Sequence, residues 1–139
     1  MNINLILPEI LVTRGAGMRY QGTTHKNLDI WKMGIDLVEK IYLITQTYPR
    51  EEIYGLRSQM RRAAISYPSN IAEGAARSSS AEFLKFLYYS LGSLAELETQ
   101  IILSQRIGYL KNTELLRFIE TLRKKHLNFI KYLKSKQKP

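Results

Sequence analysis

The chain has 139 residues and contains no cysteine, which excludes disulfide bonds and thiolate metal sites. Its length suits one domain, and a core of that size is stable without metal ions or cross-links. The formal net charge is +9, which favours a polyanionic partner, either nucleic acid or an anionic membrane surface. The absence of cysteine agrees with a reducing, cytoplasmic setting.

The positive charge is unevenly distributed along the chain. Segment 113–139 holds eight basic and two acidic residues, which is two-thirds of the excess. Most of the remainder lies around four arginines: Arg57, Arg61, Arg62 and Arg77. This concentration favours polyanion binding, and a solvated face that only keeps the protein in solution is the alternative.

Residues 1–24 show no regular apolar period and include three glycines, so we expect a flexible N-terminal arm. The apolar patch at 3–12 lacks a basic start and is interrupted by Pro8 and Glu9, which makes it a poor signal peptide. Met18 is an alternative start of the protein. No run of residues approaches the length of a transmembrane helix.

Apolar residues recur at helical spacing over 28–48, and the first helix is expected there. Pro49 stops it, because the residue before a proline avoids helical backbone angles. The residues expected on its apolar face are Trp31, Ile35, Val38, Ile41 or Tyr42, and Tyr48.

The second helix is expected near 51–76, with Glu51 and Glu52 in the first turn, where the helix dipole favours acidic side chains. Pro68 lies inside it and removes one backbone hydrogen bond. The apolar stripe keeps its phase across the proline, so a kinked helix is favoured over two short helices. The stripe consists of Ile53, Leu56, Met60, Ala63, Tyr67 and Ile71. Three nearby polar side chains can satisfy the freed backbone groups: Ser66, Ser69 and Asn70.

The third helix is expected over 80–107, where Ser79 and Glu82 form a capping box at its start. It is apolar on more than one face, although a helix in a monomeric bundle needs one apolar stripe. One stripe is Phe83, Phe86, Ser90, Leu94, Leu97 and Ile101, and the other is Leu84, Leu87, Leu91 and Ile102. The second apolar stripe indicates that this helix is central in the bundle or forms a subunit interface. Gly92 and Ala95 would allow close approach of two backbones there.

Gly108 is expected to end the third helix, and Asn112 or Thr113 to cap a fourth that reaches about residue 135. Its heptad-like seam is Leu115, Ile119, Leu122, His126, Phe129 and Leu133. Basic residues recur every seven positions on another face, as Arg117, Lys124, Lys131 and Lys138, with Arg123, Lys125 and Lys134 nearby. A helix of this length is about 35 Å long, so it offers a basic strip on a rigid rod.

Four helices with short connections predict an all-α protein, an antiparallel up-down-up-down four-helix bundle. The bundle is expected to occupy 25–135, followed by a basic tail at 136–139. No segment shows a strand pattern.

The stretch 59–77, QMRRAAISYPSNIAEGAAR, resembles the four-helix-bundle family of 23S rRNA intervening-sequence proteins. The residues that carry the resemblance are Leu56, Gln59, Arg61, Arg62, Ala63, Ala64, Ser66, Pro68, Asn70, Ile71, Ala72, Glu73, Gly74 and Arg77. Further matches are Leu28, Asp29 and Trp31, then Phe83, Phe86, Leu87, Gly92, Ser93, Leu94, Glu96, Leu97 and Glu98. Gly34 and Ser90 depart from the family pattern, which usually has an alanine at the first position and a small apolar residue at the second.

The resemblance implies antiparallel four-helix bundles that can assemble as ring-like homopentamers. The founding genes lie within intervening sequences of bacterial large-subunit rRNA genes. Related bundles include the accessory variability protein of diversity-generating retroelements, a basic pentamer that binds nucleic acid and partners a reverse transcriptase. No catalytic residues come with the family.

Catalytic and cofactor motifs are absent from the sequence. His25 lies in the arm, and His126 occupies a seam position typical of a packed core residue. There is no Glu-x-x-His pair, P-loop or dinucleotide fingerprint, so we expect no enzyme, metal or cofactor. Glu73 is expected to form an ion pair with a nearby arginine or a backbone cap. Four tyrosines could stack on bases but are more often core or interface residues: Tyr88, Tyr89, Tyr109 and Tyr132.

The sequence therefore predicts a basic, oligomeric bundle that binds nucleic acid through phosphates, with RNA favoured over DNA and no membrane partner. The candidate contacts are Arg117, Arg123, Lys124, Lys125, Lys131, Lys134, Arg57, Arg61, Arg62 and Arg77. Arg61 and Arg62 flank an apolar stripe, which favours a structural role for them. The alternative function is a protein adaptor, such as an accessory subunit of a retroelement reverse transcriptase.

Overall fold

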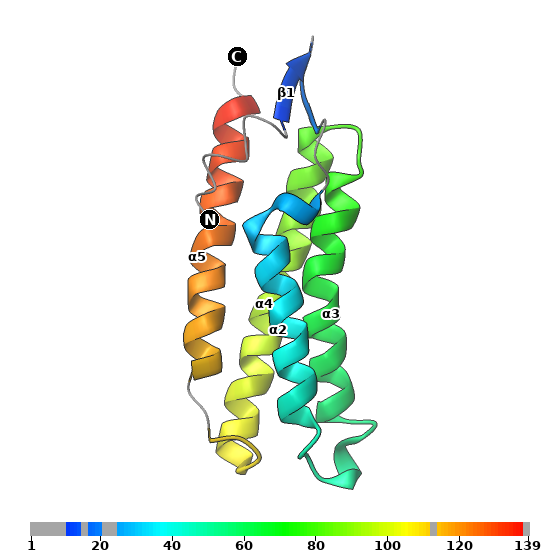
Figure 1. Ribbon diagram of the computed structural model, residues 1–139, viewed down its shortest axis with the longest axis vertical. Helices are drawn as coiled ribbons and strands as arrows, with labels where there is room; N and C mark the ends of the chain where they lie inside the picture. Colours follow the sequence, from blue (N-terminus) through cyan, green and yellow to red (C-terminus); the bar gives the residue numbers. More distant parts are fainter. Residues whose placement is uncertain (1–10, 15–16, 21–24, 112–113, 138–139) are drawn as a thin grey trace.

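The computed structural model describes residues 11–14, 17–20, 25–111 and 114–137. Its long helices are α2 (Asp29–Thr45), α3 (Leu56–Ala75), α4 (Ser80–Ile107) and α5 (Glu114–Gln137). Two 3-10 turns, η1 (His25–Asn27) and η2 (Arg50–Glu52), precede α2 and α3. Successive long helices run in opposite directions, which confirms the predicted up-down-up-down bundle (Figure 1).

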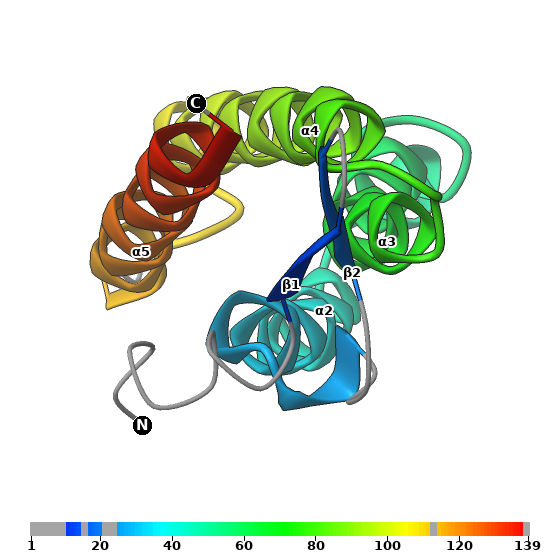
Figure 2. The same ribbon diagram turned by 90° about the horizontal axis from the view of Figure 1, so that it is seen from above.

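Seen along the bundle axis, the helices follow one another around the core in chain order, so α3 lies between α2 and α4 (Figure 2). Helix α5 packs mainly on α4. Helices α3 and α4 approach each other closely, since a Cβ atom added at Gly74 would lie 2.6 Å from Cβ of Phe86. The basic α5 and the arginine-bearing α3 are therefore diagonal to each other in the bundle.

A short β-hairpin lies at the end of the bundle where α4 begins and α5 ends (Figure 1). Strands β1 (Leu11–Arg14) and β2 (Gly17–Tyr20) are antiparallel, with Leu11 paired to Tyr20 and Arg14 to Gly17. The expectation of no strand was wrong here, because strands of four residues are too short to show a clear period. The rest of the expected arm, the cap at 112–113 and Lys138 lie outside the described residues.

The buried face of α2 differs from the predicted one by a shift of one residue. Ile30, Gly34, Leu37, Ile41 and Thr45 are buried, whereas Trp31, Ile35 and Val38 of the predicted stripe are only half-buried. The predicted positions Ile41 and Tyr48 are buried. Both stripes are apolar, and the buried one includes a glycine and a threonine, which do not mark a core in a sequence pattern. Gly34 is needed there, because an added Cβ would lie 2.8 Å from the ring of Tyr67.

Helix α3 begins at Leu56, five residues later than expected. The Glu52 side chain provides its start, since Oε1 accepts a hydrogen bond of 3.1 Å from the Leu56 N–H. The helix continues through Pro68 rather than breaking in two. Ser69 Oγ donates a hydrogen bond of 2.7 Å to the carbonyl of Ile65. Asn70 Nδ2 donates one of 2.9 Å to the carbonyl of Ser66.

The observed bounds of α4 and the observed buried face of α5 agree with the prediction. Ser79 Oγ accepts a hydrogen bond from the Glu82 N–H at 3.3 Å, and Gly108 ends α4 with a left-handed φ of 98°. All six residues of the predicted α5 seam are buried. Across the described segments, no helix is long and apolar enough to cross a lipid bilayer.

Candidate nucleic-acid interface

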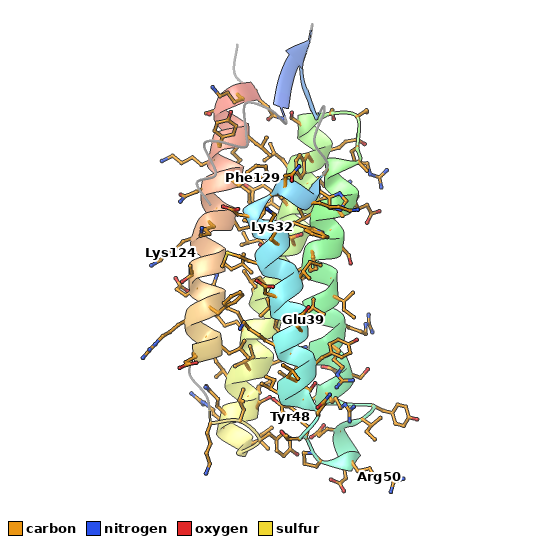
Figure 3. The ribbon with its side chains drawn as sticks, in the orientation of Figure 1. Lys32, Glu39, Tyr48, Arg50, Lys124 and Phe129 are labelled. Atoms are coloured by element: carbon orange, nitrogen blue, oxygen red, sulfur yellow. The ribbon has the colours of Figure 1, made fainter. Side chains whose placement is uncertain are left out.

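The outer face of α5 carries a row of exposed cations, which we call the α5 row: Arg117, Lys124 and Lys131. Their seven-residue spacing places them about 10 Å apart along the helix, opposite the buried seam. Lys124 points away from the bundle, whereas Phe129 points into it (Figure 3). None of the three forms an ion pair or hydrogen bond with another described residue, so all three can contact an external anion.

Arg123, by contrast, is held by protein carboxylates. Its Nη2 lies 2.8 Å from Oε2 of Glu98 on α4, and its Nη1 lies 2.6 Å from Oε2 of Glu120. Lys134 Nζ lies 5.2 Å from the centre of the Tyr88 ring. Arg123 and Lys134 therefore join α5 to α4, and Lys125 is half-buried, so the exposed strip is narrower than the sequence suggests.

Three arginines of α3 line a groove between α2 and α3 with a volume of about 360 Å³. Arg61 is fixed by its neighbours: Nε donates to Thr45 Oγ1 at 3.0 Å, Nη2 donates to the Tyr42 carbonyl at 3.3 Å, and the guanidinium lies 4.2 Å from the centre of the Tyr42 ring. Its predicted structural role is thus supported by direct contacts. Arg57 and Arg62 form no ion pair with any residue that the structure describes.

Arg77 lies just after α3, at the opposite end of that helix from the groove. Its Nη2 is 3.2 Å from Oε1 of Glu73, which confirms the ion pair expected for that glutamate. The guanidinium also lies 4.8 Å from the centre of the Phe86 ring. The ten candidate cations therefore occupy separate places, on α5, at the start of α3 and at its end.

His126 belongs to a buried hydrogen-bond network that joins three helices. Its Nε2 donates to the Leu87 carbonyl at 2.7 Å, which leaves Nδ1 to accept from the Tyr67 hydroxyl at 2.9 Å. Burial lowers the pKa of His126 to about 4 and raises that of Tyr67 well above its usual value. Within the described part of the chain, no group of three or more metal-ligating side chains could hold an ion.

The tyrosines proposed as stacking residues have different environments. Tyr88 and Tyr89 are 44% and 48% exposed on α4, whereas Tyr109 donates a hydrogen bond of 2.9 Å to Glu52 Oε2. Tyr132 is half-buried. The most exposed aromatic side chain of the described residues is Tyr54, at 96%, which the sequence did not single out. Its exposure depends on the path of the turn between η2 and α3, which the spacing of apolar residues does not predict.

The second apolar stripe of α4 is partly exposed in the single chain. Ile102 of this stripe is 40% exposed, the adjacent Leu103 is 46% exposed, and Ala95 is also exposed. A Cβ added at Gly92 would meet no atom within 4 Å. This face is therefore open to a partner, whereas Leu84 and Leu87 of the same stripe are buried within the chain.

Comparison with known proteins supports the assignment of the fold. The family model described as 23S rRNA-intervening sequence protein matches residues 26–128. A crystal structure of a protein of unknown function from the S23 ribosomal protein family of Bacteroides thetaiotaomicron superposes with a TM-score of 0.65. The two sequences are 20% identical, and the match covers 73% of this chain and 95% of the other. No curated protein matches the chain.

Proposed function

Because the chain belongs to the 23S rRNA-intervening sequence protein family, we propose that it is a non-enzymatic protein that binds structured RNA through its phosphates. The observation that carries the proposal is the α5 row, three exposed cations on one helix face without a carboxylate partner among the described residues. Lysine and arginine in that setting release counterions when they meet a phosphate backbone, which is the main source of affinity in such complexes. An RNA partner also agrees with the cytoplasmic setting expected from the sequence.

Binding of this kind is tolerant of base sequence. The α5 row presents point charges and one guanidinium along a rigid helix, and contacts to phosphates position a nucleic acid without reading its bases. Recognition would then depend on the shape of the folded RNA. Successive cations of the α5 row are about 10 Å apart. The row would therefore contact phosphates at three separate points along one helix face.

We also propose self-association into a ring-like homo-oligomer, a pentamer by the family resemblance. The exposed apolar side of α4, with Gly92, Ile102 and Leu103, supports this part of the proposal. Several α5 rows in one assembly would engage one RNA together, and linked weak contacts give a much higher apparent affinity than any single one.

The test is fluorescence anisotropy of a labelled, structured RNA over a salt series, beside duplex DNA of equal length. The variant Arg117→Glu/Lys124→Glu/Lys131→Glu lowers the net charge from +9 by two per substitution. We expect it to bind much more weakly and with a salt dependence shallower by about two to three contacts. The matched control Lys32→Glu/Lys85→Glu/Lys111→Glu has the same net charge, changes exposed lysines on other surfaces and should retain most of the affinity.

Equal losses in the two variants would mean that only net charge matters and would reject the α5 row as a site. Failure of the unmodified protein to bind RNA at low salt would reject the proposed function. Circular dichroism of each variant shows whether the helices are intact, so that a binding loss is not confused with unfolding.

A protein adaptor is the second candidate, with a reverse transcriptase as the partner class that the resemblance suggests. The observation in its favour is the same exposed apolar side of α4. Ile102→Lys together with Leu103→Lys would abolish a complex with such a partner or self-association, and the mass of the purified protein by light scattering separates the two. Purification of native complexes without any second protein would argue against the adaptor.

A further inference from the structure

The turn before α3 places the most exposed described aromatic side chain next to the arginine groove. Tyr54 directly follows Ile53, which lines the groove, and precedes Arg57, which also lines it. Tyr54 is 96% exposed, so both faces of its ring are accessible. Figure 3 shows η2, marked by Arg50, at the end of the bundle opposite the hairpin. The groove is at a different place from the α5 row, because α3 lies across the bundle from α5 (Figure 2).

The groove has one fixed cation and two free ones. The hydrogen bonds from Arg61 to Thr45 and to the Tyr42 carbonyl leave its Nη1 unused and hold the guanidinium in place. Arg57 and Arg62 have no ion-pair partner within the described residues. A cation that is already positioned loses less conformational entropy when it binds a phosphate, and a guanidinium can donate two hydrogen bonds to one phosphate.

No described carboxylate forms an ion pair with the arginines of the groove. Glu52 is committed elsewhere, since its two oxygens accept from the Leu56 N–H and the Tyr109 hydroxyl. Glu96 lies on the other side of Arg62, in the neighbouring groove between α3 and α4, beyond ion-pair distance of any described cation. Three arginines and no carboxylate thus line the arginine groove, and this excess of positive charge fits a polyanion better than an apolar protein segment.

We propose that the arginine groove, together with Tyr54, binds an unpaired segment of RNA. Phosphates would contact Arg57, Arg61 and Arg62, and a base next to them would stack on Tyr54. A nucleic-acid duplex hides its base faces, whereas an unpaired strand offers both charge and a flat face for stacking. This inference rests on the proposed RNA binding and deepens it: the α5 row would hold the backbone of the folded RNA, and the groove would select a loop or single-stranded end.

The first experiment compares a labelled single-stranded RNA of about ten nucleotides with an RNA duplex of equal length. Tyr54→Ala should weaken single-strand binding by about fivefold to a hundredfold, the range for loss of one base–aromatic stack, and leave duplex binding unchanged. Tyr89→Ala is the matched control, because Tyr89 is also an exposed tyrosine but lies on α4. Arg57→Gln/Arg62→Gln should reduce the slope of log affinity against log salt by about 1.4 for the single strand.

The second experiment locates the contact directly. Single-stranded RNA containing 4-thiouridine is cross-linked by light to the full-length protein, which is then digested with trypsin and analysed by mass spectrometry. We expect the nucleotide on the tryptic peptide 51–57, which contains Tyr54. Cross-links confined to α5 peptides would overturn the inference.

The outcomes separate this inference from the proposed function. Structured-RNA binding that depends on the α5 row, combined with an unaltered single-strand affinity of Tyr54→Ala, would reject the groove and retain the proposed function. No RNA binding at all would reject both. A change in oligomer mass for Arg57→Gln/Arg62→Gln without any change in RNA affinity would show that the groove is a protein interface, which also overturns the inference.

Discussion

The hydroxyl of Tyr67 on α3 donates a hydrogen bond of 2.9 Å to Nδ1 of His126 on α5, across 59 positions of sequence. Nε2 of the same imidazole donates to the Leu87 carbonyl on α4, and Ser90 Oγ donates to the Tyr67 carbonyl at 2.8 Å. Three helices are thus joined by one buried polar network. Because His126 donates at one nitrogen and accepts at the other, the network requires the neutral imidazole.

The stability of the bundle should depend on the protonation of His126. Burial lowers its pKa from 6.5 to about 4, so the unfolded chain binds the proton first as pH falls. The stabilisation by the neutral ring is therefore full above pH 6.5 and is lost as pH falls toward 4. The shift corresponds to about 3 kcal/mol. Urea unfolding of the protein and of His126→Gln across this pH range measures the effect.

The comparison with His126→Gln removes the contribution of the carboxylates, which titrate in both proteins. The stability difference between the two should shrink as pH falls from 7 to 4. A constant difference over this range would show that His126 does not titrate differently in the folded and unfolded states.

Loss of the Tyr67 hydroxyl should destabilise the protein. Tyr67→Phe keeps the ring, which packs beside Gly34, but leaves Nδ1 of His126 buried without a donor. An unsatisfied buried acceptor costs about 1–3 kcal/mol. Denaturant unfolding measures this loss, and Tyr89→Phe is the control, because its ring is exposed. Equal stability of Tyr67→Phe and the unmodified protein would contradict the assigned hydrogen bond.

Two glycine-to-alanine substitutions in helices should have opposite effects. In Gly74→Ala the new Cβ would lie 2.6 Å from Cβ of Phe86 and 3.3 Å from the carbonyl oxygen of Phe83. Helices α3 and α4 would have to separate, at about 1–3 kcal/mol. At Gly92 a Cβ meets nothing within 4 Å, so alanine should stabilise the monomeric fold by up to about 1 kcal/mol through its helix propensity.

Thermal unfolding of both variants checks this pair, with light scattering to record the oligomeric state. If Gly92→Ala lowers the oligomer mass while the isolated fold stays intact, Gly92 contacts a second copy of the chain. Similar stabilities for the two variants would contradict the close approach of α3 and α4 at Gly74.

The helices whose ends carry local signals could be predicted from the sequence. Ser79 with Glu82 at one end and Gly108 at the other define α4 over the range that the structure has, because caps and terminators act through neighbouring residues. The start of α3 could not be predicted, because its cap comes from Glu52, four residues earlier, across an irregular turn. The departures from the family pattern at Gly34 and Ser90 also have a tertiary reason, since both contact Tyr67.

The chemical type of the candidate site could be predicted, but not which cations are available. Arg117 and Arg123 are equivalent in composition and charge, yet Arg123 is paired with Glu98, which lies on another helix. The sequence does not predict this ion pair, because it forms only when α4 and α5 pack against each other. The high exposure of Tyr54 likewise follows from the path of the turn after η2 rather than from any spacing of residues.

Glu52 joins the start of α3 to the connection that follows α4, and its removal should be seen in the titration of Tyr109. The hydrogen bond from the Tyr109 hydroxyl to Glu52 Oε2, at 2.9 Å, is the main reason that the pKa of Tyr109 is raised; slight burial and the charges of Glu52 and Glu51 add to it. A carboxylate that accepts a hydrogen bond from the hydroxyl stabilises the neutral phenol. Glu52→Gln keeps the size of the side chain but removes its charge. We therefore expect the pKa of Tyr109 to fall toward its ordinary value, as measured by NMR titration of labelled tyrosines.

The same variant should loosen the start of α3, because an amide oxygen is a weaker acceptor than a carboxylate for the Leu56 N–H. Faster amide hydrogen exchange at Leu56 would report this directly. Glu51→Gln is the control: its side chain is exposed and contributes only a distant charge to Tyr109, so both the pKa and the exchange rate should change little. An unchanged Tyr109 titration in Glu52→Gln would show that the hydroxyl bonds elsewhere in solution.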